Sequence, residues 1–214
     1  MTSLKQTIES MDLPVPEPAI CQRLSDYCDA LWKANETVNL TRHTTLEKFV
    51  ARDLVDTIAV SRLIPAERKV LDMGSGGGVP GMVLAILRPD LDVTLTESVG
   101  KKAVALQAIA SEIKLDTEIY NSRAEKLLED FSFDFTTVRA VGAIHKICTW
   151  LADVWPSAGK VLAIKGPNWK NERNEAAEKG LLRKIDIEVV AEYSSPGAEW
   201  SSYVLQLNAK GYRK

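Results

Sequence analysis

A glycine-rich segment is the part of this sequence best suited to binding a ligand. Residues 71–81 read Leu-Asp-Met-Gly-Ser-Gly-Gly-Gly-Val-Pro-Gly and follow a short apolar run. Glycine lets the backbone turn tightly and approach a ligand where a Cβ atom would clash. The spacing Gly76-x-Gly78-x-x-Gly81 fits the fingerprint of dinucleotide-binding loops, although that pattern alone is weakly specific. A tight strand-to-helix turn without any ligand is the alternative interpretation.

A second spacing in the same segment favours a different nucleoside cofactor. Asp72-x-Gly74-x-Gly76-x-Gly78 matches the loop of methyltransferases, with an acidic residue two positions before the first glycine. S-Adenosylmethionine has no pyrophosphate, so its site needs room and a hydrogen-bonding acid rather than a phosphate cradle. Asp72 would either face the amino group of the ligand or organise the loop. The predicted cofactor-binding residues of this segment are Asp72, Gly74, Ser75, Gly76, Gly78 and Val79.

Charged residues also follow the next predicted strands. Glu97 ends the second strand, where a carboxylate accepts both ribose hydroxyls of NAD or of S-adenosylmethionine. Glu125 follows the third strand, near the expected adenine, or simply occupies the first turn of a helix. Arg139 ends the fourth strand, where it would meet the cofactor carboxylate, a target phosphate or a neighbouring acid. Ligands of open α/β sheets bind at these strand ends.

The residues after the fourth strand exclude several kinds of methyl transfer. Residues 138–142 read Val-Arg-Ala-Val-Gly and lack the Asp/Asn-Pro-Pro-aromatic motif typical of exocyclic-amine methylation. Cys148 is the only cysteine nearby, and its place inside a predicted helix indicates a core residue. No cluster of acids and histidines suggests a metal. N7 of guanine needs neither base nor nucleophile because its ring lone pair attacks directly, so this chemistry is permitted.

The order of predicted elements indicates an α/β fold. Strands at 69–72, 92–97, 116–120, 133–138 and 160–165 alternate with helices at 82–87, 101–113, 124–128, 144–154 and 171–183, which predicts a parallel sheet. Runs 185–193 and 200–207 are joined by a short loop and should be antiparallel. The predicted fold is therefore a class I S-adenosylmethionine-dependent methyltransferase, Rossmann-like, with a seven-stranded mostly parallel sheet and an antiparallel C-terminal hairpin.

The first 65 residues are predicted to be a helical extension packed on a core of residues 66–214. Helical periodicity covers 19–34, after an extended proline-rich segment at 13–18. Thr44 and Glu47 have capping-box spacing before a second helix. Asn39, Thr41, Arg42 and His43 lie between these helices and would either approach the cofactor mouth or only form a turn.

Composition limits the classes of partner. The 214 residues carry 27 Lys and Arg against 29 Asp and Glu, a net charge of −2, which argues against an avid, charge-driven nucleic-acid binder. A basic face on an acidic body remains compatible with this balance. Three cysteines and two histidines disfavour disulfides or structural zinc. Without a signal peptide or membrane-length apolar run, the expectation is a cytoplasmic monomer with no membrane partner.

Several segments together resemble the RsmG family, also called GidB. They are Asn35-x-x-x-Asn39-Leu-Thr41, Arg52-x-x-x-Asp56-Thr57, the glycine loop 71–81, Leu95-Thr-Glu-Ser98 with Lys101-Lys102, Ser122-Arg-Ala-Glu125, Val138-Arg-Ala-Val141 and Ile164-Lys-Gly166. The resemblance implies a bacterial methyltransferase that uses S-adenosylmethionine to methylate N7 of a guanine in 16S ribosomal RNA. It implies cofactor contacts by Gly74, Val79, Ala124, Glu125 and Arg139. Ser98, next to Glu97, is also predicted to bind the cofactor.

Three positions depart from the family pattern: Val79 stands where Phe is frequent, Asp53 where His is usual, and Gly142 where Ala is common.

Arg139 and Lys165 are the predicted catalytic residues, with Lys165 at the end of the fifth strand as the candidate phosphate or guanine contact. Residues 160–184 concentrate lysine and arginine, interleaved with glutamates typical of a solvated helix face. The C-terminal Lys210, Arg213 and Lys214 either contact RNA or form a frayed end, which is favoured.

The resemblance leaves open whether the substrate is free ribosomal RNA, the small ribosomal subunit or an assembly intermediate. Two other functions remain as alternatives. One is a small-molecule methyltransferase on the same fold, because a fold does not fix its substrate. The other is a non-catalytic module that binds S-adenosylmethionine or a nucleotide. An NAD-dependent dehydrogenase is disfavoured because the chain lacks a second catalytic domain.

Overall fold

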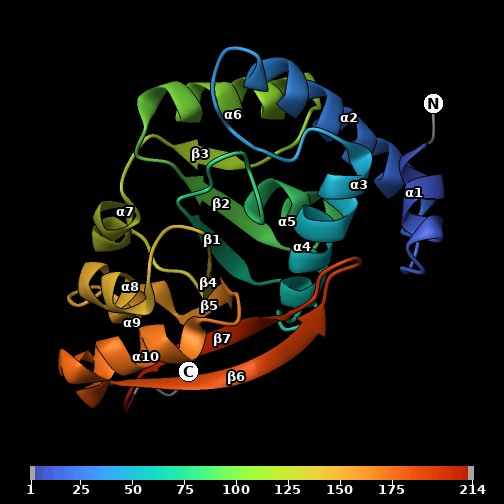
Figure 1. Ribbon diagram of the computed structural model, residues 1–214. Coiled ribbons are helices and arrows are strands. Elements are labelled where there is room, and N and C mark those ends of the chain that lie inside the picture. The colour runs from blue at the N-terminus through green and yellow to red at the C-terminus, as the bar shows by residue number, and fades with distance from the viewer. Residues whose placement is uncertain (1–2, 212–214) are drawn as a thin grey trace.

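The structure, a computed structural model, describes residues 3–211 and contains one seven-stranded sheet (Figure 1). The strand order is β3-β2-β1-β4-β5-β7-β6. The first five strands are parallel: β1 (Lys69–Met73), β2 (Asp92–Thr96), β3 (Glu118–Tyr120), β4 (Phe135–Arg139) and β5 (Lys160–Lys165). The last two, β6 (Ile185–Ser194) and β7 (Ser201–Ala209), form an antiparallel hairpin joined to β5 through β7. The predicted fold class is confirmed, including the hairpin.

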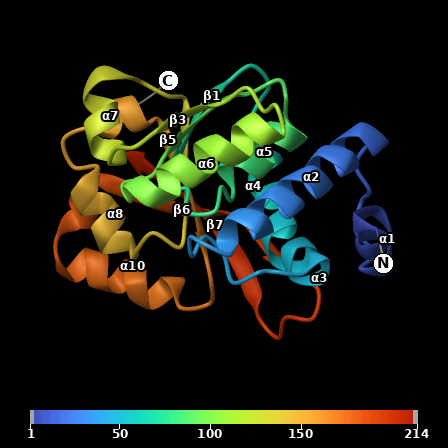
Figure 2. The same ribbon diagram turned by 90° about the horizontal axis from the view of Figure 1, so that it is seen from above.

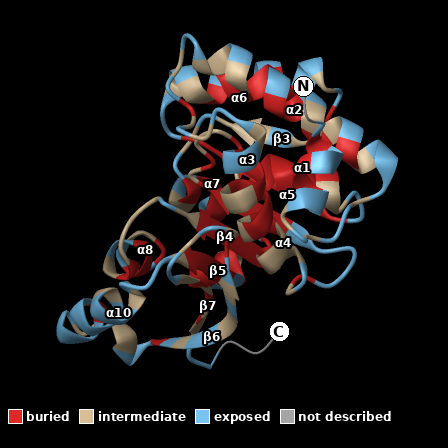
Figure 3. Cartoon of the chain, turned by 45° about the vertical axis from the view of Figure 1, so that its right-hand side comes forward, coloured by how far each residue is buried: buried red, intermediate tan, exposed pale blue. Residues whose placement is uncertain are grey.

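Helices cover both faces of the sheet, as Figure 2 shows. One face carries α4 (Val55–Ser61), α5 (Gly81–Leu87) and α6 (Gly100–Glu112), with α2 (Pro18–Asn35) packed on α5 and α6. The other carries α7 (Ala124–Asp130), α8 (Ile144–Trp150), α9 (Trp155–Ala158) and α10 (Trp169–Glu178). Side chains alternate between these faces along each strand, so Val70 belongs to one core cluster and Leu71 to the other. Buried residues gather along the central strands, whereas α10 is mostly exposed (Figure 3).

The N-terminal part contains two features that the sequence did not reveal. Helix α1 (Leu4–Ser10) begins with a capping box between Ser3 and Gln6. The helix predicted after Thr44 starts one residue later, because the Thr45 hydroxyl accepts the Lys48 N–H. It consists of α3 (Leu46–Lys48), a π-helical segment η1 (Phe49–Leu54) and α4. Segments of this kind are frequent at functional sites, and η1 carries Asp53.

Two predicted helices end earlier than expected. Helix α8 ends at Trp150, and α9 starts separately with a proline in its first turn. Helix α10 ends at Glu178 because Gly180 adopts a left-handed conformation with φ of 72° and a short 3-10 turn, η2 (Leu181–Arg183), follows. Arg213 and Lys214 lie outside the described residues. No helix within residues 3–211 is long and apolar enough to cross a membrane.

Candidate active site

Two adjoining cavities lie at the carboxyl ends of β1, β2 and β4. They measure 230 and 350 Å³ and share Gly74, Ser98 and Val141. A larger cavity of 560 Å³ lies at the opposite end of the sheet, where Phe135 and Lys160 begin their strands. Ligands of open α/β sheets bind at the carboxyl ends, so the two adjoining cavities form the candidate active site.

The glycine loop is held open by its backbone. Gly74 has φ of 72°, and a Cβ atom there would lie 2.8 Å from Val141 Cγ2. Gly78 has φ of 97°, and a Cβ there would lie 2.7 Å from Met82 Sδ. The Gly74 and Ser75 N–H groups both donate to the Thr96 carbonyl, at 3.0 and 2.9 Å. Positions 74 and 78 therefore require glycine. The two hydrogen bonds to Thr96 fix the loop to the end of β2.

Asp72 holds this loop in place through hydrogen bonds of its carboxylate. Its carboxylate accepts the Gly81 N–H at 3.1 Å and the Thr137 hydroxyl at 2.8 Å, and the residue is only 1% exposed. Burial raises the pKa of Asp72, while these hydrogen bonds oppose the rise. Among the described residues, neither Asp72 nor Gly78 lines the two cavities. Of the two roles considered for Asp72, the geometry shows the organising one.

Glu97 lies at the floor of the 350 Å³ cavity. One carboxylate oxygen accepts the Gly76 N–H at 3.0 Å, and the other accepts the Val99 N–H at 2.8 Å. A carboxylate offers about four acceptor sites, so each oxygen retains capacity for a ligand hydroxyl. The backbone bonds fix the carboxylate in place, with its neighbour Ser98 lining both cavities.

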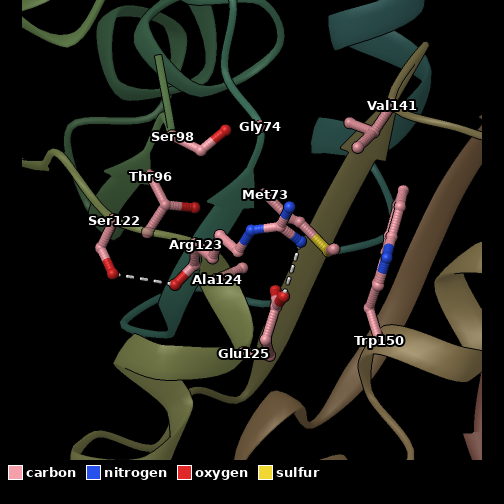
Figure 4. A pocket seen from close by; sticks show the side chains of 10 residues that line it. All are labelled: Met73, Gly74, Thr96, Ser98, Ser122, Arg123, Ala124, Glu125, Val141 and Trp150. Carbon is pink, nitrogen blue, oxygen red and sulfur yellow. Dashed lines mark hydrogen bonds and ion pairs between the residues drawn. The ribbon is translucent and has the colours of Figure 1, made fainter. Parts of the chain in front are cut away.

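The 230 Å³ cavity is lined by polar groups and an indole ring. Figure 4 shows Thr96, Ser98 and Ser122 along one side and Val141 and Trp150 along the other. Arg123 and Glu125 form an ion pair of 3.2 Å at its edge, and Ala124 and Met73 complete the lining. An indole opposite polar groups suits a flat, hydrogen-bonding ring.

Arg139 is held between two carboxylates from the N-terminal helices. Its Nη2 lies 2.5 Å from Asp53 Oδ1, and its Nη1 lies 3.4 Å from Asp56 Oδ2. The Tyr193 hydroxyl donates to Asp56 at 2.6 Å. Burial alone would lower the pKa of Arg139, but Asp53 and Asp56 outweigh it and the pKa is raised. Burial also raises the pKa of Asp56. Of the three partners considered for Arg139, the structure shows neighbouring acids.

Lys165 lies beside the site rather than in it. Its ammonium group donates to the Gly142 carbonyl at 2.5 Å and to Glu172 at 2.8 Å. Glu172 also accepts the Ile144 N–H at 3.0 Å. Within residues 3–211, Lys165 is not among the residues that line either cavity. The side chain therefore ties the loop after β4 to α10, and its catalytic role stays a prediction.

The loop between α2 and α3 covers the 350 Å³ cavity. Asn35 Oδ1 accepts the N–H groups of Leu40 and Thr41 at 2.8 and 3.0 Å, so the Asn-Leu-Thr segment does form a turn. Leu40 and Thr41 also line the cavity. Of the four residues predicted in this segment, Thr41 lines the cavity, whereas Asn39, Arg42 and His43 are not part of its lining, so their approach to the cofactor stays a prediction. We call residues 40–45 the roof loop.

The structure brings most of the predicted cofactor residues to the two cavities: Gly74, Ser75, Gly76, Val79, Glu97, Ser98, Ala124, Glu125 and Arg139. Sequence reasoning did not identify Trp150 or Lys102 as lining residues, nor Asp53 as the partner of Arg139. Trp150 gave no signal because it lies in an ordinary amphipathic helix. No group of acids, histidines and cysteines that would hold a metal is found in residues 3–211.

The sheet order, the glycine loop at the end of β1 and the site at the carboxyl ends define a class I methyltransferase fold. Solved structures share it: a precorrin-6y C5,15-methyltransferase from Geobacter metallireducens (TM-score 0.55, 13% identity, 79% of this chain and 92% of that one) and a ribosomal protein L11 methylase from Lactobacillus delbrueckii subsp. bulgaricus (TM-score 0.53, 11% identity, 72% and 77%). At these identities the likeness concerns the fold alone.

The family follows from the sequence comparisons. The family model GidB, described as rRNA small subunit methyltransferase G, matches residues 20–197. A ribosomal RNA small subunit methyltransferase G from Rhodopirellula baltica is 47% identical over 88% of this chain and 81% of its own length. One from Halorhodospira halophila is 32% identical over 86% and 87%. The chain belongs to the GidB family and is a methyltransferase.

Proposed function

We propose that this protein transfers the methyl group of S-adenosylmethionine to N7 of a guanine in 16S ribosomal RNA of the small subunit. The observation that carries the proposal is the pair of adjoining cavities, of which one is lined by an indole opposite polar groups and the other is covered by the roof loop. The named relatives are ribosomal RNA small subunit methyltransferases, which supports RNA as the acceptor.

The residues at the site fit S-adenosylmethionine. The loop from Gly74 to Gly76 forms a cradle that a Cβ atom at Gly74 would fill. We propose that Trp150 and Val141 hold the adenine, that Glu97 accepts the ribose hydroxyls, and that the glycine loop receives the amino-acid end. When bound, the cofactor supplies an electrophilic methyl group on a sulfonium. Asp72 acts by holding the loop rather than by contact.

The side chains around the cavities suit an acceptor that needs no activation. Cys148 is 2% exposed, and burial raises its pKa to about 11; Cys28 is fully buried, and burial raises its pKa as well, so neither supplies a thiolate at neutral pH. The carboxylates of Asp53 and Asp56 are engaged with Arg139. Guanine N7 presents a lone pair in the ring plane, so the task left to the protein is alignment. This chemistry matches what the site offers.

Arg139 and Lys165 have different parts in this proposal. Arg139 lines the covered cavity, where its cation stabilises the substrate side of the site. Lys165 keeps the loop around Gly142 in place through its two hydrogen bonds. We propose that the division predicted at residue 65 is functional: among the described residues, 3–65 supply the roof loop and the acids of Arg139, and 66–211 act as the catalytic core. Because small subunits are cytoplasmic, we propose that the protein acts there, as a monomer.

The direct test is radiolabelled methyl transfer with three acceptors: small ribosomal subunits lacking the modification, deproteinised 16S ribosomal RNA, and a set of small-molecule nucleophiles. We expect label in one guanine of the RNA, at N7. The ratio between subunits and free RNA identifies the physical substrate. Label only in small molecules would replace the proposal with the small-molecule function. Cofactor binding without turnover on any acceptor would indicate a binding module.

A further inference from the structure

The charged cluster around Arg139 continues into the roof loop through His43. Asp53 Oδ1 lies 2.5 Å from Arg139 Nη2 and 2.9 Å from His43 Nδ1, so one oxygen joins both side chains. The Asp53 side chain is 2% exposed, whereas that of His43 is 28% exposed. An ionised carboxylate only accepts hydrogen bonds, which assigns the proton to His43 Nδ1. Asp53 thus connects a buried cation to a partly exposed imidazole on the roof loop.

The backbone of His43 is fixed at both ends. Its N–H donates to the Thr41 hydroxyl at 3.0 Å, and its carbonyl accepts the Trp32 indole N–H at 2.8 Å. Asn35 holds the preceding residues of the roof loop. The imidazole is therefore held on its backbone and at Nδ1. Within the described residues the structure gives His43 Nε2 no hydrogen bond, so this nitrogen is the group left for a ligand.

The charges around His43 favour an anionic ligand. Behind it, the carboxylates of Asp53 and Asp56 face the buried cation Arg139, and Arg52 also acts on Asp56. Residues 41–52 outside the cluster carry three basic residues and one acid, which are Arg42, Lys48, Arg52 and Glu47. Lys102 lines the cavity that the roof loop covers. Phosphate oxygens of RNA are the acceptors that such basic groups recognise.

We propose that His43 is a substrate-binding residue whose Nε2–H donates to a phosphate oxygen of the RNA next to the target guanine, and that Asp53 is the residue that positions it. The inference rests on the proposed function, since it takes RNA as the substrate. It adds a specific contact and assigns Asp53 two tasks, because the same oxygen holds Arg139 in the covered cavity and His43 on the roof loop.

The test uses the full chain with His43→Gln, which keeps a polar side chain but removes the cation. We expect the KM and the filter-binding Kd for small subunits to rise about five- to tenfold at pH 6, since one phosphate contact is lost. The kcat and the Kd for S-adenosylhomocysteine should not change. His43→Lys should recover most of the RNA affinity because it restores a cation. His145→Gln is the matched control, because His145 pairs with Glu175 on α10, away from the cavities.

Asp53→Asn tests the positioning role by comparison with His43→Gln in single and double variants. The Asp53 carboxylate contacts both His43 and Arg139. If Asp53 acts on the RNA through His43, Asp53→Asn should weaken subunit affinity in the wild type but add no further loss in the His43→Gln background, because residues that act through one contact are not additive. An effect on packing alone would add to the loss in His43→Gln.

Three results would overturn the inference: unchanged subunit affinity in His43→Gln, an equal loss of S-adenosylhomocysteine affinity in that variant, or a His43→Lys variant no better than His43→Gln. Its failure is distinguishable from failure of the proposed function. If the wild-type protein binds subunits through His43 but methylates no guanine N7, the contact stands and the reaction is wrong. If guanine is methylated while His43→Gln binds normally, the reaction stands and the contact is wrong.

Discussion

The two halves of the active site are built in different ways. The half at the ends of β1 and β2 is made by backbone: positive φ angles at Gly74 and Gly78, and N–H groups bonded to Thr96 and Glu97. The half around Arg139 is made by side-chain charges that join Asp53, Arg139 and His43. The backbone half requires glycine at positions 74 and 78, whereas the charged half depends on the contacts between oppositely charged side chains.

This difference suggests a division of labour between cofactor and RNA. A rigid backbone cradle suits a ligand whose shape does not vary, which is the cofactor in every turnover. A charged cluster built from three separate parts of the chain suits the polyanionic acceptor. The N-terminal helices supply Asp53 and Asp56, β4 supplies Arg139, and β6 supplies Tyr193. The variants below separate the two halves, beginning with the largest expected effect.

Replacing Gly74 with valine should abolish cofactor binding. The residue has φ of 72°, which β-branched side chains strongly disfavour, and its Cβ would lie 2.8 Å from Val141. We expect the Kd for S-adenosylhomocysteine, measured by titration calorimetry, to rise at least about a hundredfold, a loss of about 2.7 kcal/mol or more. Gly197→Val is the matched control, because Gly197 has φ of 73° but open space around it. A wild-type Kd in Gly74→Val would contradict the backbone cradle.

Replacing Arg139 with alanine should affect turnover and stability together. It leaves Asp53 and Asp56 partly buried without their cation, which costs about 3–5 kcal/mol in comparable cases. We expect turnover to fall about a hundredfold and the unfolding free energy to fall near neutral pH.

The stability loss in Arg139→Ala should shrink as the pH falls toward about 4. Burial already raises the pKa of Asp56, and a carboxyl with a raised folded-state pKa destabilises the fold only where it is ionised. Denaturant unfolding at several pH values measures this. A loss of stability that does not depend on pH would show that packing, not charge, holds this half together.

Replacing Lys165 with methionine should slow turnover without weakening cofactor binding. The change removes the hydrogen bond to Gly142 and the ion pair with Glu172 while keeping most of the side-chain volume. Because small displacements of substrate-positioning groups are costly, we expect kcat to fall about tenfold. Steady-state kinetics with small subunits and calorimetry with S-adenosylhomocysteine measure the two quantities. Unchanged kcat would remove Lys165 from the catalytic residues altogether.

Trp150 tests the nucleoside cavity with a smaller effect. Trp150→Leu removes the aromatic wall and should weaken S-adenosylhomocysteine binding about tenfold, which is the scale of one aromatic stacking contact. Trp150→Phe should retain most of the affinity. Equal losses in both variants would indicate a packing defect rather than stacking, and no loss in either would place the adenine elsewhere.

The sequence predicted the backbone half well because its information is local. The role of a glycine in a strand-to-helix turn, or of an acid at a strand end, can be predicted from the neighbouring residues in the sequence. The parallel arrangement of the first five strands and the antiparallel terminal hairpin also followed from alternation along the chain. Gly74 and Glu97 line the cavity at these strand ends, and their contact with a cofactor stays a prediction.

The charged half could not be predicted because its contacts join distant residues. Asp53 meets Arg139 across 86 positions, and Tyr193 meets Asp56 across 137. In the sequence, Asp53 was recognised only as a departure from the family pattern. The spacing of apolar residues did not predict the π-helical segment that carries it. Lys165 ended a strand as expected, but its partner Glu172 lies on α10 and turns the ammonium group away from the cavities.

A structure of the protein with S-adenosylhomocysteine tests the division of labour most directly. We predict adenine in the cavity between Trp150 and Ser122, ribose hydroxyls on Glu97, and Arg139 still bonded to Asp53. The RNA half would then be complete before the substrate arrives. Adenine outside this cavity, or an Arg139 guanidinium that has left Asp53 for the cofactor carboxylate, would contradict the separation of the two halves.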